Sequence, residues 1–164
     1  CRQRGLEFDR DGLIASSGTV DAELLASLDA LPFYSQTGAK SLGREWVEKE
    51  IFPMIDSRGL EFADLLSTFT EHAARQVARV VRRVGKPHPT MLITGGGALN
   101  VYLVERIREL AGCEVKIPPR QIIEFKEALI FAFLGALYMA DEASCLSSVT
   151  GAATDNIGGM LFKI

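Results

Sequence analysis

Residues 91–100 read MLITGGGALN, and they carry the strongest signal in the sequence. Its first four residues follow Pro89 and form a short apolar run that is typical of a buried strand. Three consecutive glycines then lead into an amphipathic pattern over 98–111, which predicts a helix that ends at Gly112. A second strand is expected over 113–117. These elements form a βαβ unit, so we expect two parallel strands joined by a right-handed crossover.

Helical patterns lie on both sides of this unit. Apolar residues recur every three or four positions from 62 to 84, which predicts the longest helix of the chain. The segment 123–140 is apolar nearly all round, so we expect its helix to be buried against the sheet. The other expected elements are a hairpin over 6–15 around an Asp-Gly turn, helices over 21–31 and 43–54, and a last strand over 160–164. Together they predict an α/β fold with a small sheet and predominantly helical content.

The composition of the 164 residues excludes several classes of protein. The formal net charge of −3 lacks the strongly basic footprint of a nucleic-acid binder. The longest apolar run covers only 128–140, which is shorter than the roughly 20 residues of a membrane-spanning helix, so no membrane partner is expected. The three cysteines (Cys1, Cys113 and Cys145) form no CxxC pair and no Cys/His set with zinc-ligand spacing. We therefore expect no metal site in this segment and a reducing, cytoplasmic setting.

The Gly95-Gly96-Gly97 segment is the strongest indication of function. Glycines let the backbone approach a ligand closely, and the N-terminus of the following helix suits a phosphate group. The alternative is a tight strand-to-helix turn without a ligand. The spacing matches neither a P-loop nor the Rossmann fingerprint, because Asn100 stands where the third glycine would be. A glycine-rich adenosine loop of the actin-like kinase type remains.

Several polar residues have simpler interpretations. His72 and His88 have no nearby Ser or Cys in a recognisable nucleophile arrangement, so we interpret both as structural or surface residues. A solvated helix face, with a partner surface as the alternative, is the simplest interpretation of four arginines: Arg75, Arg79, Arg82 and Arg83.

Five segments resemble, in order, the C-terminal half of the anhydro-N-acetylmuramic acid kinase family, which belongs to the sugar kinase, Hsp70 and actin superfamily. They are FDRDG at 8–12 with its continuation to Gly18, KSLGRE at 40–45, ITGGGALN at 93–100, EALIFAFL at 127–134 and SVTGA at 148–152. The resemblance covers nearly the whole chain. It implies one lobe of the actin-like ATPase (ribonuclease H-like) fold over residues 1–164, the C-terminal lobe of a two-lobe kinase. Leu42 departs from the family, in which a small polar residue such as threonine is expected.

Enzymes of this family use ATP to phosphorylate 1,6-anhydro-N-acetylmuramic acid while water opens the anhydro ring. The product is N-acetylmuramic acid 6-phosphate, and the reaction serves cell-wall recycling in bacteria. The resemblance implies that Glu127 faces the sugar pocket and that four residues line the adenosine or phosphate site: Gly95, Gly96, Gly97 and Asn100. It also implies Mg²⁺ on the ATP phosphates and a cytoplasmic homodimer. From the residues alone, Glu127 also fits a carboxylate that stabilises the N-terminus of its own helix.

The chain opens with Cys1 rather than methionine, so we expect a fragment of a longer polypeptide. The family's phosphate-binding motif and general-base aspartate would then precede Cys1. The segment would contain no catalytic residue and would be inactive alone. Two alternatives remain open, namely a helical protein-interaction module without catalysis and a sugar kinase relative with a different substrate.

Overall fold

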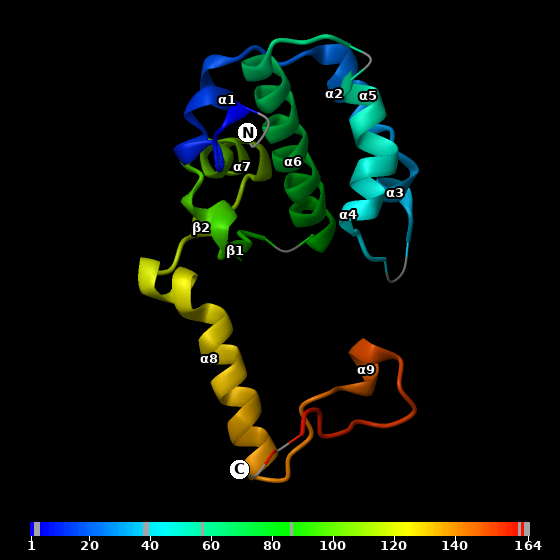
Figure 1. Cartoon of the computed structure of the whole chain (residues 1–164), viewed down its shortest axis with the longest axis vertical. Helices are drawn as coiled ribbons and strands as arrows, with labels where there is room; N and C mark the ends of the chain where they lie inside the picture. The colour runs from blue at the N-terminus through cyan, green and yellow to red at the C-terminus, as the bar shows by residue number, and fades with distance from the viewer. Residues whose placement is uncertain (2–3, 38–39, 57, 86, 161, 163–164) are drawn as a thin grey trace. The chain divides into compact units, whose positions relative to one another are not determined.

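The computed structural model describes residues 1, 4–37, 40–56, 58–85, 87–160 and 162. The chain forms two compact units, Cys1–Pro118 and Pro119–Ile164. Figure 1 shows the helices and strands of both units. Within the described ranges, no helix combines the length and the apolar character that crossing a membrane requires.

The first unit contains most of the secondary structure. Its helical elements are η2 (Arg10–Gly12), α1 (Leu13–Ser17), α2 (Ala22–Asp29), α3 (Pro32–Ser35), α4 (Arg44–Trp46), the π-helical η3 (Val47–Ile51), α5 (Phe52–Asp56), α6 (Phe62–Val84), η4 (Gly96–Leu99) and α7 (Val101–Ala111), and its strands are β1 (Thr90–Leu92) and β2 (Glu114–Lys116). The predicted helices over 21–31, 43–54 and 62–84 are confirmed.

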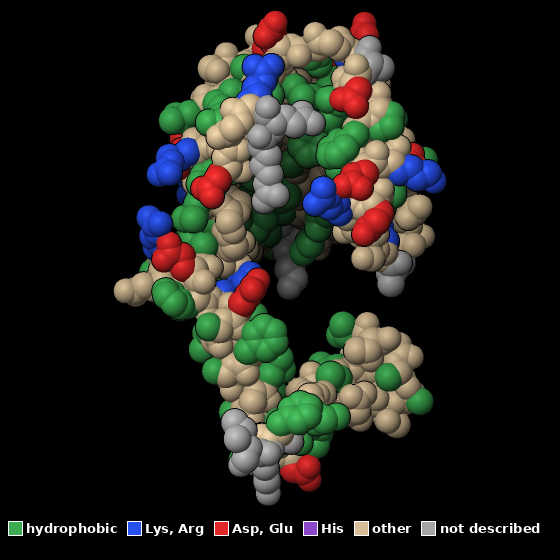
Figure 2. All heavy atoms as spheres, in the orientation of Figure 1, with side chains coloured by type: hydrophobic (Ala, Val, Ile, Leu, Met, Phe, Trp, Pro, Cys, Tyr) green, Lys and Arg blue, Asp and Glu red, His purple; other side chains and the backbone are tan. Residues whose placement is uncertain are grey.

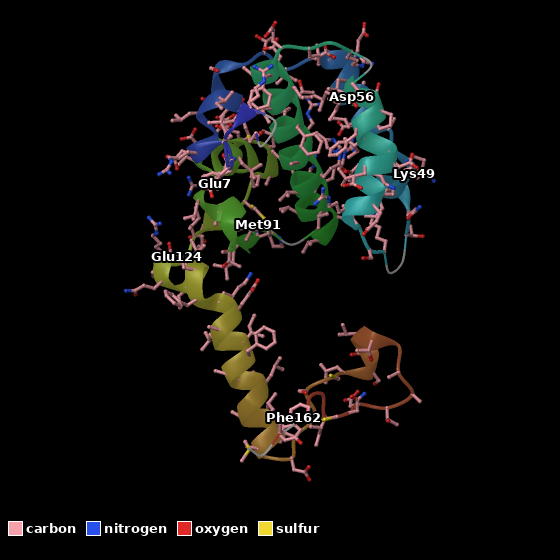
Figure 3. All side chains as sticks on the ribbon, viewed as in Figure 1. Glu7, Lys49, Asp56, Met91, Glu124 and Phe162 are labelled. Carbon is pink, nitrogen blue, oxygen red and sulfur yellow. The ribbon has the colours of Figure 1, made fainter. Side chains whose placement is uncertain are left out.

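The predicted βαβ unit is also confirmed. Strands β1 and β2 pair in parallel, with Met91 opposite Val115, and α7 connects them. Figure 3 labels Met91 on β1, the strand that leads into the glycine segment. The described residues therefore form a helix-rich α/β fold with a small two-stranded parallel sheet.

Helix α6 organises the core of the first unit because it packs against α1, α2 and α7. Apolar side chains along α6 contribute to two separate hydrophobic clusters. One consists of Leu24, Leu28, Leu31 and Ile51, with Leu65 and Phe69 of α6 packed against it. The other joins α6 to α7 through Ala74, Ala78, Ile107 and Ala111. The alanines let the two helix backbones approach closely, which fixes the position of α7 behind the glycine segment.

The predicted hairpin over 6–15 is wrong. Asp11 and Gly12 do adopt positive φ angles, 57° and 75°, as an Asp-Gly turn predicts. The chain after the turn nevertheless forms α1 instead of a strand. Both carboxylate oxygens of Asp9 accept hydrogen bonds of 2.9 Å from backbone N–H groups of α1, which stabilises the start of this helix. The turn signal was local, and it did not determine what the flanking segments form.

The second unit consists mainly of α8 (Arg120–Met139) and α9 (Ser147–Thr150). The predicted helix over 123–140 is confirmed, whereas its burial against the sheet would involve the first unit and stays a prediction. Only Ile123 of α8 is buried, whereas Phe125 and Phe131 are 64% and 70% exposed. Figure 2 shows apolar side chains along α8 on the face in view. The expected strand over 160–164 includes residues 161, 163 and 164, which lie outside the described residues.

Candidate functional site

The glycine segment connects β1 to α7 in a conformation that needs its first glycine. Gly95 has φ 84° and ψ −177°, a region of backbone space that side chains exclude. The segment Gly96–Leu99 then forms the 3₁₀ turn η4, closed by a hydrogen bond of 3.0 Å from Ala98 N–H to Gly95 O. We call residues 95–100 the glycine loop. Its shape brings consecutive backbone N–H groups to the end of a parallel strand, where anions bind in many α/β folds.

The space beside the loop is open at Gly96. A Cβ atom placed on Gly96 would meet no atom within 4 Å, and one on Gly97 would meet only Leu103 Cδ2 at 3.9 Å. Packing among the described residues therefore does not require that Gly96 and Gly97 lack side chains. Their absence instead leaves the backbone accessible to a ligand.

Asn100 closes the loop and begins α7. Its side-chain Oδ1 accepts a hydrogen bond of 2.9 Å from Leu103 N–H, which is the interaction of an N-cap residue. Its backbone N–H donates to Gly97 O at 3.2 Å. Thr94, just before the loop, has a buried hydroxyl with no hydrogen-bond partner among the described residues, so its bonding capacity is unused.

Glu127 lies in the second unit, on α8, with an exposed side chain. Helix α8 begins at Arg120, earlier than expected, so Glu127 lies beyond its first turn. The field of a helix terminus falls off within about one turn, which argues against the alternative that Glu127 stabilises the N-terminus. The structure brings Gly95, Gly96, Gly97 and Asn100 together in one loop of the first unit, and Glu127 belongs to the other unit.

The second unit also contains a pocket of about 670 Å³ between α8 and the following loop. It is lined by Phe131, Leu134, Gly135, Tyr138, Met139, Ser144, Cys145, Gly158, Gly159 and Met160. None of these side chains is charged, so the pocket does not suit a phosphate group. Among the residues that the structure describes, no group of three or more His, Cys, Asp or Glu side chains could hold a metal ion.

An ion-pair cluster around the buried Glu71 joins α6 to α7, and the sequence interpretation missed it. Glu71 is 4% exposed and accepts hydrogen bonds from Arg75 Nε at 2.9 Å and Arg106 Nε at 2.8 Å. Burial alone would raise the pKa of Glu71, but the hydrogen bonds and charges of the two arginines outweigh it and lower the pKa. The interpretation of Arg75 and Arg79 as a solvated face is correct only in part, because their side chains are 44% and 41% exposed but both also pair with Asp29. The Glu71–Arg75 spacing of four residues was the available signal.

His72 lies next to this cluster and is 2% exposed. Its Nδ1 is 2.8 Å from Asp29 Oδ1, which favours the neutral tautomer with the proton on Nδ1. Its Nε2 is buried and has no hydrogen-bond partner among the described residues. Burial lowers the pKa of His72, with Arg79 and Arg75 adding to the effect and Asp29 opposing it. The interpretation of His72 as a structural residue fits this position.

The burial of His72 predicts a pH-dependent stability. Its folded-state pKa is lower than its unfolded value of about 6.5, so the unfolded state takes up the proton first. The contribution of neutral His72 to the free energy of unfolding is complete above that pH. It is lost as the pH falls, with a limiting slope of about 1.4 kcal/mol per pH unit. Urea unfolding between pH 7.5 and 5.5 measures it. His72→Gln should flatten the profile, whereas His88→Gln, at an exposed position, should leave it unchanged. An equal slope in His72→Gln would contradict this account.

Comparison with known proteins finds one family that matches nearly the whole chain. The family model for anhydro-N-acetylmuramic acid kinase matches residues 1–163. The chain is similar to a protein named anhydro-N-acetylmuramic acid kinase from Variovorax paradoxus (strain S110), with 38% identity over 96% of this chain and 44% of that protein. A protein of the same name from Xanthomonas axonopodis pv. citri (strain 306) is 36% identical over 98% of this chain and 44% of that protein. A third, from Xanthomonas oryzae pv. oryzae (strain MAFF 311018), is 35% identical over 98% and 44%. The chain thus spans less than half the length of these relatives.

Proposed function

The chain belongs to the anhydro-N-acetylmuramic acid kinase family, and we propose that it forms the C-terminal lobe of an ATP-dependent kinase that phosphorylates 1,6-anhydro-N-acetylmuramic acid. The observation that supports this role most is the glycine loop. It combines Gly95 in a glycine-only conformation, open space at Gly96 and a capped helix behind it. These are the features that a backbone site for nucleotide phosphates requires.

In the proposed reaction, water adds to the anomeric carbon of the sugar and the bond from that carbon to O6 breaks. The released O6 attacks the γ-phosphorus of ATP, ADP leaves, and the proton of the water passes to a general base. The products are N-acetylmuramic acid 6-phosphate and ADP. Phosphoryl transfer depends mainly on positioning and charge stabilisation, so the glycine loop would contribute by orienting ATP.

The individual residues have separate proposed roles. The backbone at Gly95, Gly96 and Gly97 would line the adenosine or phosphate site, and Asn100 would complete it. Glu127 would accept a hydrogen bond from a sugar hydroxyl, for which its exposed carboxylate is available. The general base and the second phosphate-binding motif would come from the part of the kinase that this chain does not span.

The architecture that we propose is one lobe of the actin-like ATPase fold, with ATP in a cleft between two lobes. The parallel βαβ unit with its glycine loop supports this assignment. Mg²⁺ would accompany the ATP phosphates, since it is commonly bound by substrate phosphates with few protein ligands. The family resemblance further suggests a cytoplasmic homodimer.

Isothermal titration calorimetry with ATP and Mg²⁺ tests this function, first on this chain and then on the intact gene product. We expect binding and turnover of the anhydro sugar in the intact gene product, and neither turnover nor strong binding in the chain alone. No ATP binding by either protein would contradict the kinase assignment and favour the interaction module. ATP binding without turnover of this sugar would instead favour a relative with another substrate.

A further inference from the structure

We propose that the turn Asp9–Gly12 is a positioning element of the glycine loop and acts on it through Asn100. This inference rests on the proposed function, because it assigns a role in nucleotide binding. The turn lies far from the glycine loop in sequence, and neither its acidic residues nor Gly12 has a part in the reaction described above. In the first unit, however, η2 packs directly against α7.

The turn is held rigidly on its own side. Asp9 Oδ1 accepts a hydrogen bond from Ile14 N–H and Asp9 Oδ2 accepts one from Ala15 N–H, both at 2.9 Å. A further hydrogen bond of 3.2 Å runs from Gly12 N–H to Asp9 O. Asp11 and Gly12 both have positive φ angles, so the chain reverses tightly at this point. These hydrogen bonds and the tight turn fix the position of the Gly12 backbone.

Gly12 and Asn100 are in direct contact. Gly12 is buried, and a Cβ atom at this position would overlap Asn100 Oδ1 and lie 2.7 Å from Tyr102 Cβ. Contacts of that kind are closer than atoms can approach, so any side chain at position 12 would displace the start of α7. The missing side chain of Gly12 therefore provides the space that Asn100 occupies.

A displacement of Asn100 would disturb two hydrogen bonds at the end of the glycine loop. The Oδ1 atom that faces Gly12 is the same atom that accepts the hydrogen bond from Leu103 N–H. The backbone N–H of Asn100 donates to Gly97 O, so the last glycine of the loop is attached to the same residue. Asn100 is therefore a positioning residue that relates the first turn of α7 to the glycines, and Gly12 determines where it lies.

The primary test is Gly12→Ala in the intact gene product, with Gly59→Ala as the matched control. Gly59 has a comparable φ of 58°, but a Cβ atom there would meet nothing within 4 Å. The control therefore reproduces the backbone strain without the contact. We expect Gly12→Ala to raise KM for ATP at least tenfold, with kcat and KM for the sugar within twofold of wild type. Equal KM values for ATP in Gly12→Ala and Gly59→Ala would overturn the proposal.

A second pair of variants tests the proposal even if Gly12→Ala fails to fold. Asn100→Ser retains a side-chain oxygen that can cap α7, whereas Asn100→Ala does not. If Asn100 acts by positioning, serine should raise KM for ATP less than alanine does. Equal losses in both variants would show that Asn100 acts only through its own contact with the nucleotide and not by capping α7, which overturns the positioning role.

Hydrogen exchange at Leu103 N–H tests the contact without any nucleotide. We expect faster exchange in Gly12→Ala than in Gly59→Ala, because the hydrogen bond from Leu103 N–H to Asn100 Oδ1 is disturbed. Equal exchange rates would contradict the contact itself. If wild-type protein fails to bind ATP while Gly12→Ala still exchanges faster, the proposed function fails and the packing role of Gly12 stands.

Discussion

Replacing Gly96 with valine is expected to weaken ATP binding at least about 100-fold, which corresponds to about 2.7 kcal/mol. A Cβ atom at Gly96 meets no protein atom within 4 Å and its φ angle is not positive, so valine fits without displacing the chain. The added methyl groups would instead occupy the space through which a phosphate reaches the loop backbone. The free energy of unfolding should change by less than about 1 kcal/mol.

Calorimetry on the intact gene product measures the affinity, and urea unfolding of the same samples measures the stability. Gly135→Val is a suitable control, because Gly135 also has open space around its Cβ position but lies on α8 outside the glycine loop. The control should bind ATP within twofold of wild type. An unchanged affinity in Gly96→Val would count directly against the glycine loop as the nucleotide site.

The second large effect is expected for Glu71→Gln, which should destabilise the protein by about 2–3 kcal/mol. Glu71 is buried on α6, where it accepts a hydrogen bond from Arg75 of the same helix and one from Arg106 of α7. Glutamine removes the charge and presents an N–H donor to guanidinium groups that are donors themselves. Because the side chains of Arg75 and Arg106 are 44% and 27% exposed, water relieves part of the cost.

Glu109→Gln provides the matched control for this prediction. Glu109 also pairs with Arg106, but its side chain is 63% exposed. Exposed ion pairs contribute little, so the control should lose no more than about 0.5 kcal/mol. Chemical unfolding of both variants at pH 7 gives the comparison, and similar losses in the two would show that burial of Glu71 is not the source of its stabilisation.

The elements that the sequence predicted well depend on local patterns. Helix α6 follows from its repeating apolar positions, and the strand–glycine–helix order follows from a few adjacent residues. The hairpin failed for the opposite reason. The dihedral angles of Asp11 and Gly12 were local, but the next residues form α1, which packs against α6 and α7 far along the chain.

The polar cluster could not be predicted because its partners are distant in sequence. Asp29 and His72 are 43 residues apart, and Glu71 and Arg106 are 35 residues apart. The contact between Gly12 and Asn100 has the same character: the glycines of the loop are visible in the sequence, but the turn that positions them is not. For α8 the all-round apolar pattern predicted the helix correctly, yet such a pattern does not identify the surface that covers it.

If the glycine loop binds ATP, its backbone amide resonances should respond to the nucleotide in isotopically labelled intact gene product. On titration with ATP and Mg²⁺ we expect the largest shifts at residues 95–100, with smaller changes in the amides of α2. Saturable ATP binding that leaves the resonances of residues 95–100 in place while others move would contradict it.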